Sequence, residues 1–232
     1  MFKKIQLLFN TVKYLKAGQI LNRIKRKFIK PKVDLSSIPE TSYPYNKIKP
    51  VIRCSQRVYG ESSFKFLNKE FVLKTPKDWN TENQDKLWLY NLHYFDDLNA
   101  VNSVQRVIWH SSLIQKWIND NTLGFGNGWE PYPSSLRIVN WVKWFLLDLN
   151  SHNNIKQIWL DSLAIQTRFL SKNLEYHLLG NHLFANAKAL VFSGLFFKGR
   201  EADRWYQLGL SIINRELSEQ VLSDGGNFEL SP

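Results

Sequence analysis

Residues 177–190, "HLLGNHLFANAKAL", decide how this chain folds, because they begin a run that stays almost apolar as far as Phe197. The run predicts a long helix over residues 178–197. It contains two histidines, two asparagines and a lysine within fourteen positions. Each buried polar group costs about 1–3 kcal/mol unless a partner forms a hydrogen bond with it. We therefore expect these side chains to contact specific partners.

Two interpretations of this run remain open from the residues alone. On an uninterrupted helix, His177, Asn181 and Lys188 would lie within about 40° of one another, and His182 and Asn186 would form a second pair on another face. Alternatively, Gly180 breaks the helix and Asn181 caps a new one. In that case His182 is a hydrogen-bonded histidine of the core.

The sequence on either side of this run is also helical in pattern. Apolar residues at helical spacing begin near residue 85. They predict helices over 100–120, 134–149, 154–171 and 201–221, in addition to 178–197. The connecting loops are short and rich in Gly, Asn and Ser, which makes consecutive helices antiparallel neighbours. The prediction is an all-α body of antiparallel helical hairpins, arranged as a solenoid or as part of an (α/α) toroid.

The N-terminal third has a different pattern. Prolines at positions 31, 39, 44 and 50 indicate a connector, and short β-prone runs between residues 51 and 74 predict a β-hairpin. We therefore divide the chain into a basic amphipathic segment (1–33), a proline-rich connector with the hairpin (34–84) and the helical body (85–232).

The net charge of +11 is concentrated in the first segment. Residues 1–33 contain ten Lys or Arg and no acidic residue, whereas the rest has 21 basic and 20 acidic residues, a balance of about +1. A nearly neutral body does not favour nucleic acid as a partner. The amphipathic residues 1–30 either bind an anionic membrane surface or pack as a basic helix on the body.

Other classes of function find little support in the sequence. The single cysteine, Cys54, excludes an internal disulfide and a thiolate metal cluster, and the five histidines lack metal-ligand spacing. There is no clear signal peptide and no stretch typical of a spanning helix, so we expect a cytoplasmic or peripheral membrane location. The glycine-rich "GFGNGW" (124–129) has Trp129 where a dinucleotide fingerprint needs glycine.

Four stretches of the sequence, in this order, resemble the N-terminal toroid of the heparinase II/III-like polysaccharide lyases. They are "LWLYNLHYFDDL" (87–98), "GWEPYPSSLRIVNWVKW" (128–144), "LEYHLLGNHLFANAKALVFSGLFF" (174–197) and "DGGNFELSP" (224–232). The resemblance implies a cleft for acidic polysaccharide and β-elimination next to a uronic acid. It implies that Asn181 hydrogen-bonds the substrate carboxylate and that His182 serves as base or charge neutraliser.

The resemblance also implies parts of a site that this sequence does not contain. The family's tyrosine follows the stretch that matches "FELSP", and a C-terminal β-sandwich, with a structural zinc in some members, follows the toroid. We therefore expect no cofactor in this chain and no activity from the chain alone. The alternatives are a non-catalytic glycan-binding or polysaccharide-biosynthesis accessory protein, and a hydrolase on an α/α barrel.

Further residues of the matching stretches are predicted to contact the glycan. The predicted stacking surfaces are Trp129, Tyr132 and Trp141, and the predicted polar contacts are His93, Tyr94, Arg137 and Glu229. Arg137 could pair in a bidentate manner with a uronate carboxylate. The structural alternatives are that Trp141 belongs to the core and that Arg137 pairs with Glu130. The carboxylates Glu130, Glu175, Asp224 and Glu229 could also supply a glycosidase pair, depending on their separation in space.

Overall fold

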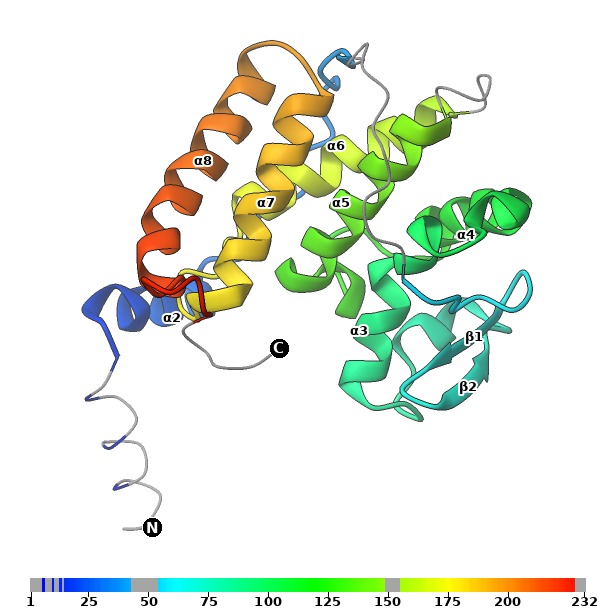
Figure 1. The fold of residues 1–232 in the computed structure, drawn as a ribbon, viewed down its shortest axis with the longest axis horizontal. Helices are drawn as coiled ribbons and strands as arrows, with labels where there is room; N and C mark the ends of the chain where they lie inside the picture. The colour runs from blue at the N-terminus through cyan, green and yellow to red at the C-terminus, as the bar shows by residue number, and fades with distance from the viewer. Residues whose placement is uncertain are drawn as a thin grey trace.

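A computed structural model of the chain describes residues 15–42, 54–148 and 155–227, together with the single positions 6, 10 and 13. The described part is mostly helical, with one small sheet (Figure 1). This confirms the predicted all-α body with a small hairpin before it. The predicted site residue Glu229 lies outside the described residues.

The helices of the body lie close to the predicted segments. They are α3 (Lys86–Tyr94), α4 (Val107–Asp120), α5 (Pro131–Asp148), α6 (Gln157–Ser171), α7 (Gly180–Phe196) and α8 (Arg200–Gln220). The largest difference is at α4, which begins at Val107 after a 3₁₀ turn over Ser103–Arg106 instead of near residue 100. Helix α5 begins at Pro131. Proline has no backbone N–H, and an N–H at the first position of a helix has no partner within the helix, so proline costs no hydrogen bond there.

The predicted hairpin is present as β1 (Ser63–Phe66) and β2 (Lys69–Val72), which pair antiparallel. Its two-residue loop places Leu67 and Asn68 at φ of 51° and 61°. Two central residues with positive φ form the turn type whose twist matches paired strands. Phe64 and Phe66 of β1 point into the core, so the hairpin covers one end of the helical body.

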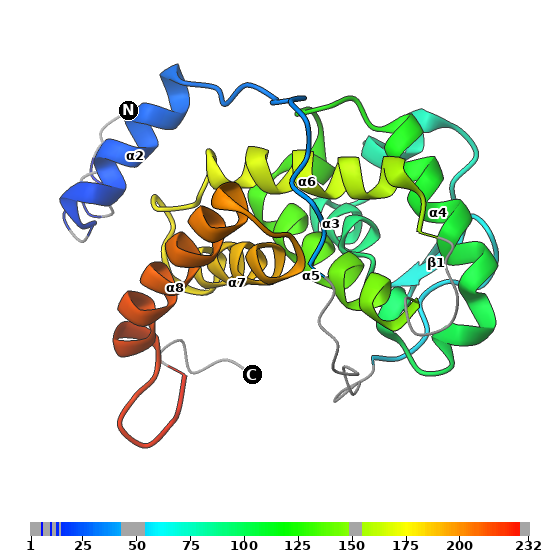
Figure 2. The same ribbon diagram turned by 90° about the horizontal axis from the view of Figure 1, so that it is seen from above.

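The helical hairpins form two rows. Helix α5 contacts both α3 and α7, whereas α4 contacts α6, and α8 packs along α7. Viewed from above, the helices follow an open arc from α8 to α4 (Figure 2). This arrangement is the one expected for part of an α/α toroid, and it places the start of α7 beside the start of α5.

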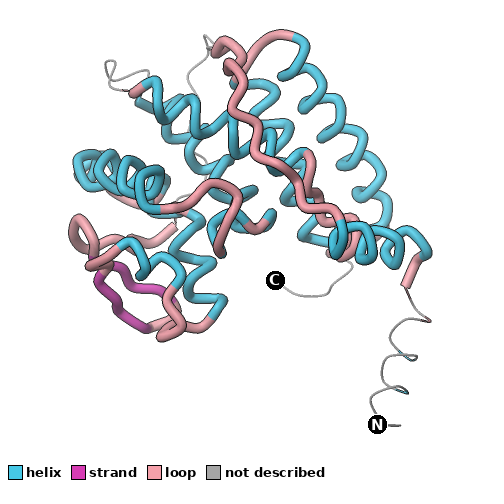
Figure 3. Tube along the Cα trace, turned by 180° about the vertical axis from the view of Figure 1, so that it is seen from behind, coloured by secondary structure: helices cyan, strands magenta, loops and turns pink. Residues whose placement is uncertain are grey.

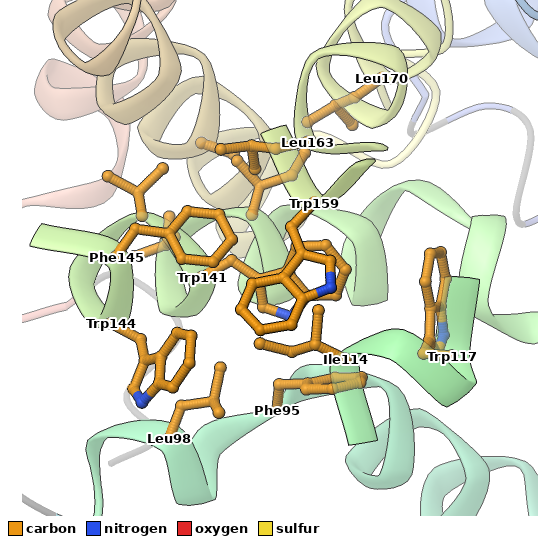
Figure 4. Close-up of a cluster of buried hydrophobic side chains, with 14 of the residues drawn as sticks. Phe95, Leu98, Ile114, Trp117, Trp141, Trp144, Phe145, Trp159, Leu163 and Leu170 are labelled. Atoms are coloured by element: carbon orange, nitrogen blue, oxygen red, sulfur yellow. The ribbon is translucent and has the colours of Figure 1, made fainter. Parts of the chain in front are cut away.

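Aromatic side chains fill the space between the rows. Trp141, Trp144 and Phe145 of α5 meet Trp159 of α6 in one cluster (Figure 4). Eight of the nine tryptophans are buried, so the tryptophan content serves mainly to build the core.

The segment that follows α2 (Ala17–Phe28) crosses the back of the helices in extended form (Figure 3). Arg168 of α6 donates to the carbonyl oxygens of Ser36 and Ser37 at 2.6 and 2.7 Å, and it also pairs with Glu201 of α8. Thr41 forms a β-bridge with Phe197. This part of the predicted connector is therefore fixed to the body, although the predicted domain boundaries themselves stay predictions.

Within the described ranges, no helix combines the length and apolar character that a membrane span requires.

Candidate functional site

The start of α7 is set by a reversal of the backbone. Leu179 and Gly180 have φ of 62° and 58°, and the N–H groups of Leu178 and Leu179 both donate to the Glu175 carbonyl. The helix begins at Gly180, so the prediction that His177 shares a helical face with Asn181 and Lys188 is wrong. His177 lies in the turn before the helix, as the predicted break at Gly180 requires.

Asn181 and His182 are therefore in the first turn of α7, and Asn181 is exposed. The cap position itself is Leu179, so Asn181 lies two residues beyond the cap that the alternative interpretation assigned to it. The N–H groups of a first helical turn have no partner within the helix and favour a negatively charged ligand. This position suits an asparagine that contacts a carboxylate.

Asn186, one turn further along α7, is a completely buried polar residue. Its amide oxygen accepts the N–H of Glu175 at 2.8 Å, and its amide nitrogen donates to Oε2 of Glu175 at 3.1 Å and to the Ser135 hydroxyl at 3.0 Å. Both ends of the Asn186 side chain are thus satisfied. The interaction holds the Glu175 backbone and carboxylate against α7 and ties both to α5.

The second oxygen of the Glu175 carboxylate faces His182. Oε1 lies 3.2 Å from Nδ1 of His182, and the two side chains are 8% and 34% exposed. If Nδ1 carries the proton, it donates to Glu175 and leaves a lone pair on Nε2, which is the tautomer a proton acceptor needs. The ring of Tyr132 packs on the imidazole, with centroids 4.5 Å apart. His182 is therefore oriented by a carboxylate and an aromatic ring.

Tyrosine rings continue this surface onto α3. Tyr94 meets Tyr132 edge to face with centroids 6.0 Å apart, and Tyr90 lies 6.5 Å from Tyr94. The Tyr90 hydroxyl donates to Glu130, which also pairs with Lys86. Burial raises the pKa of Tyr90 and of Tyr94, and Glu130 raises that of Tyr90 further. Both phenols therefore stay protonated at neutral pH.

Of the predicted residues, the structure thus brings together His182, Tyr132 and the nearly buried Tyr94, and Asn181 directly precedes His182 in the first turn of α7. Tyr90 and Asn186 also belong to this cluster. The sequence did not single out Tyr90, although its spacing of four residues from Tyr94 on a helix was a usable signal. From the sequence, Glu175 is one of four carboxylates that could supply a glycosidase pair. In the structure it orients His182.

His93 does not lie on this surface, in contrast to the prediction of a polar substrate contact. It is completely buried, with Nε2 on the Trp79 carbonyl at 3.0 Å and Nδ1 accepting the Trp117 indole N–H at 3.0 Å. Burial, together with the nearby charge of Arg137, lowers the pKa of His93 to about 3. His93 is therefore a neutral core histidine with a fixed tautomer.

Arg137 is also completely buried, so the predicted pairing with a substrate carboxylate is corrected. Its guanidinium donates to Gln166 at 2.8 Å, to the Gly128 carbonyl at 2.7 Å and to the His93 carbonyl, and it lies 3.9 Å from the Trp117 ring. Burial lowers its pKa. The alternative pairing with Glu130 is not found either, because Glu130 pairs with Lys86.

Trp129 and Trp141 were predicted to stack on sugar, and both are buried. Trp141 contacts Phe95, Trp117 and Phe145, so the structural alternative, a core residue, is the correct one. Trp129 packs edge to face on Phe169. In the described part of the chain, no three His, Cys, Asp or Glu side chains gather as metal ligands.

Paired rows of helical hairpins, and a histidine–carboxylate pair beside a tyrosine surface, define a protein of the α/α-toroid class with a polar site at the start of α7. Residues 77–232 match the family described as Heparinase II/III N-terminus. The chain belongs to this family.

Three curated relatives are similar to the chain, and each is named heparin-sulfate lyase. The protein from Bacteroides stercoris is 34% identical over 106 residues, and the one from Pedobacter heparinus is 33% identical over 125 residues. These alignments cover 45% and 50% of this chain but 16% and 19% of the relatives. The protein from Bacteroides thetaiotaomicron is 26% identical over 176 residues, 68% of this chain and 24% of the relative. No solved structure matches the chain.

Proposed function

We propose that the protein is a polysaccharide lyase that cleaves a uronate-containing acidic polysaccharide by β-elimination, and that the start of α7 supplies part of its site. One observation carries the proposal. Asn181 and His182 lie side by side in the first turn of α7, and Glu175 and Tyr132 hold the His182 ring, within a region similar to heparin-sulfate lyases.

The chemistry explains why such a pair is useful. The proton next to a uronate carboxylate is a weak acid, because its removal places a second negative charge beside the first. The site must neutralise the carboxylate, remove that proton and protonate the leaving oxygen. The C–H electron pair at C5 becomes the C4–C5 double bond, and the bond between C4 and the glycosidic oxygen breaks, so that this oxygen leaves with the bonding electrons and takes up a proton. The reaction is balanced without a redox or group-transfer cofactor.

In this proposal each residue of the cluster has one task. The Asn181 amide donates to the substrate carboxylate. His182 has one of two tasks: with a single proton, on the nitrogen that faces Glu175, it removes the substrate proton, whereas with both nitrogens protonated it adds positive charge beside the carboxylate. Tyr132, which is partly exposed, offers its ring surface to the sugar, and the nearly buried Tyr94 supports the Tyr132 ring from below. Tyr90 and Tyr94 do not act as bases, because their raised pKa values keep them protonated, and the Tyr90 hydroxyl already donates to Glu130.

The test is cleavage by the full-length protein of a panel that contains heparan sulfate, heparin, alginate and a neutral polysaccharide as control. A lyase yields an unsaturated uronate, which absorbs in the ultraviolet, from an acidic member of the panel only. Saturated reducing ends would identify a hydrolase. Binding of acidic oligosaccharides without any cleavage would contradict the proposal and identify a non-catalytic glycan-binding protein.

A further inference from the structure

Helix α2 packs on the body through its polar side. The Gln19 amide lies 3.4 Å from the carbonyl oxygens of His177 and Leu178, and Arg26 donates to the Asn173 carbonyl at 3.1 Å. Just before the helix, Lys16 pairs with Glu219 of α8 at 2.7 Å. None of the residues of α2 is buried. The body therefore contacts the face of α2 that would normally be turned to water.

The apolar side of α2 points away from these contacts. At about 100° per residue, Leu21, Ile24 and Phe28 lie about 180° around the helix from Gln19 and Arg26. Their exposed fractions are 66%, 52% and 76%. A helix of this kind usually turns its apolar stripe to the core, so the orientation of α2 is the reverse of that of an ordinary surface helix.

Cations border this apolar stripe on both sides. By the same geometry, Lys25 lies along one edge of the stripe and Lys27 along the other, and Arg23 lies further round, toward the face that contacts the body. No acidic residue occurs between positions 1 and 33, so no carboxylate of this segment neutralises them. An apolar face between two basic edges is typical of helices that lie in the plane of a membrane interface.

We propose that α2 is an interfacial helix that attaches the protein to an anionic lipid surface, with Leu21, Ile24 and Phe28 inserted among the acyl chains. The combination of apolar and basic groups selects this partner. An acidic polysaccharide would pair with the cations but leave the three apolar side chains in water. A second copy of the chain, docked through the same face, would bring like charges together. The proposal is independent of the proposed lyase activity.

The test is binding of the full chain to phosphatidylcholine vesicles with and without phosphatidylserine. The chain is expected to bind the anionic vesicles in low salt and to bind neutral vesicles much more weakly. The variant L21Q/I24Q/F28Q is expected to bind anionic vesicles at least about tenfold more weakly, because it removes the inserted side chains. The control V104Q/I108Q/L195Q changes three other exposed apolar residues and should bind like the parent.

A second variant tests the charges. R23Q/K25Q/K27Q should bind anionic vesicles about tenfold or more weakly at low salt, and 0.5 M salt should weaken the parent in the same way. Retention of L21Q/I24Q/F28Q on immobilised heparin should equal that of the parent, because the cations are intact. Thermal unfolding of each variant shows that the body is still folded.

The proposal is overturned if L21Q/I24Q/F28Q binds anionic vesicles as well as the parent does, or if neutral vesicles bind as well as anionic ones. It is also overturned if the parent does not bind vesicles and self-associates in a way that L21Q/I24Q/F28Q abolishes. That result would make the exposed face of α2 an interface between copies of the chain.

Discussion

Nδ1 of His182 lies 3.2 Å from Oε1 of Glu175, and the other oxygen of the same carboxylate accepts a hydrogen bond from Asn186 at 3.1 Å. The Glu175 side chain is nearly buried, whereas that of His182 is partly exposed. A buried residue thus fixes a carboxylate, and the carboxylate fixes a histidine at the surface. This relationship makes Asn186 and Glu175 positioning residues for His182.

Substitution of Glu175 by Gln should lower turnover of an acidic polysaccharide by about 10²-fold or more. The carboxylate accepts from both His182 and Asn186, whereas an amide has only one oxygen and can accept from only one of them. A histidine in the wrong tautomer cannot accept the substrate proton. The measurement is kcat of the full-length protein, with the exposed Glu61→Gln as control. Unchanged kcat would show that Glu175 does not orient His182.

His182→Ala and Asn181→Ala should each lower turnover by about 10²-fold or more, the scale expected when proton transfer or a charge-stabilising donor is lost. Neither should unfold α7, because alanine is the best helix former and Asn181 is exposed. Ultraviolet product formation and the urea midpoint should be measured together. An Asn181→Ala protein that unfolds but keeps its turnover would assign Asn181 a structural role instead.

Asn186→Ala should destabilise the fold by about 2–4 kcal/mol. The substitution leaves the Glu175 N–H and one oxygen of its carboxylate without a partner in the interior, and each unsatisfied group costs about 1–3 kcal/mol, whereas the Ser135 hydroxyl keeps its bond to the Pro131 carbonyl. Urea unfolding measures the change. The exposed Asn119→Ala should stay within about 0.5 kcal/mol of the parent. Equal stability of the two variants would contradict the structural role of Asn186.

The sequence predicted much of the helical body because hydrophobic periodicity is a local property. The start of α7 at Gly180 could also be anticipated, since glycine readily adopts the positive φ found there. The orientation of α2 could not. Its amphipathic pattern shows that one face is apolar, but only the contacts of Gln19 and Arg26 with the body show which face is turned inward.

For the candidate site, the sequence indicated which stretches contribute polar residues but not which of these residues are buried. His93 and Arg137 are polar residues in stretches that resemble a lyase, which favours a substrate contact. In the structure both residues are part of the core. His93 accepts the Trp117 indole N–H, and Arg137 donates to the carbonyl oxygens of His93 and Gly128 and lies over the Trp117 ring. Burial of a charged group against backbone carbonyls depends on how distant segments pack, and no local pattern reports it.

Asp97 makes stability depend on pH. Its buried carboxylate accepts the N–H groups of Arg57 and Val58 and hydrogen bonds from Arg106 and His110. Burial raises the pKa of Asp97, but these hydrogen bonds lower it more, so the folded pKa lies below the unfolded value of about 3.9. The ionised Asp97 carboxylate therefore makes its full contribution to the free energy of unfolding above about pH 4, and this contribution is lost as the pH falls through the folded pKa.

Asp97→Asn should consequently cost about 3 kcal/mol of unfolding free energy at pH 7, because a charged partner of Arg106 is removed from the interior. Urea unfolding at pH 7, 5 and 3 measures the difference in unfolding free energy between parent and variant. This difference should be smaller at pH 3 than at pH 7. A difference that is constant over this range would show that the Asp97 pKa is the same in both states.

Gly209→Ala should destabilise the contact between α7 and α8, although alanine is favoured over glycine within a helix by about 1 kcal/mol. A Cβ at Gly209 would lie 2.7 Å from the Ala187 carbonyl oxygen and 3.0 Å from the Val191 backbone nitrogen. Backbone atoms cannot move aside as the end of a side chain can, so the helices must separate, at a cost of about 1–3 kcal/mol. Gly18→Ala in α2 is the matched control, because nothing lies within 4 Å of a Cβ there. Thermal unfolding should show a lower midpoint for Gly209→Ala and an unchanged or higher one for Gly18→Ala. A rise for both would mean that α7 and α8 pack less closely than the structure shows.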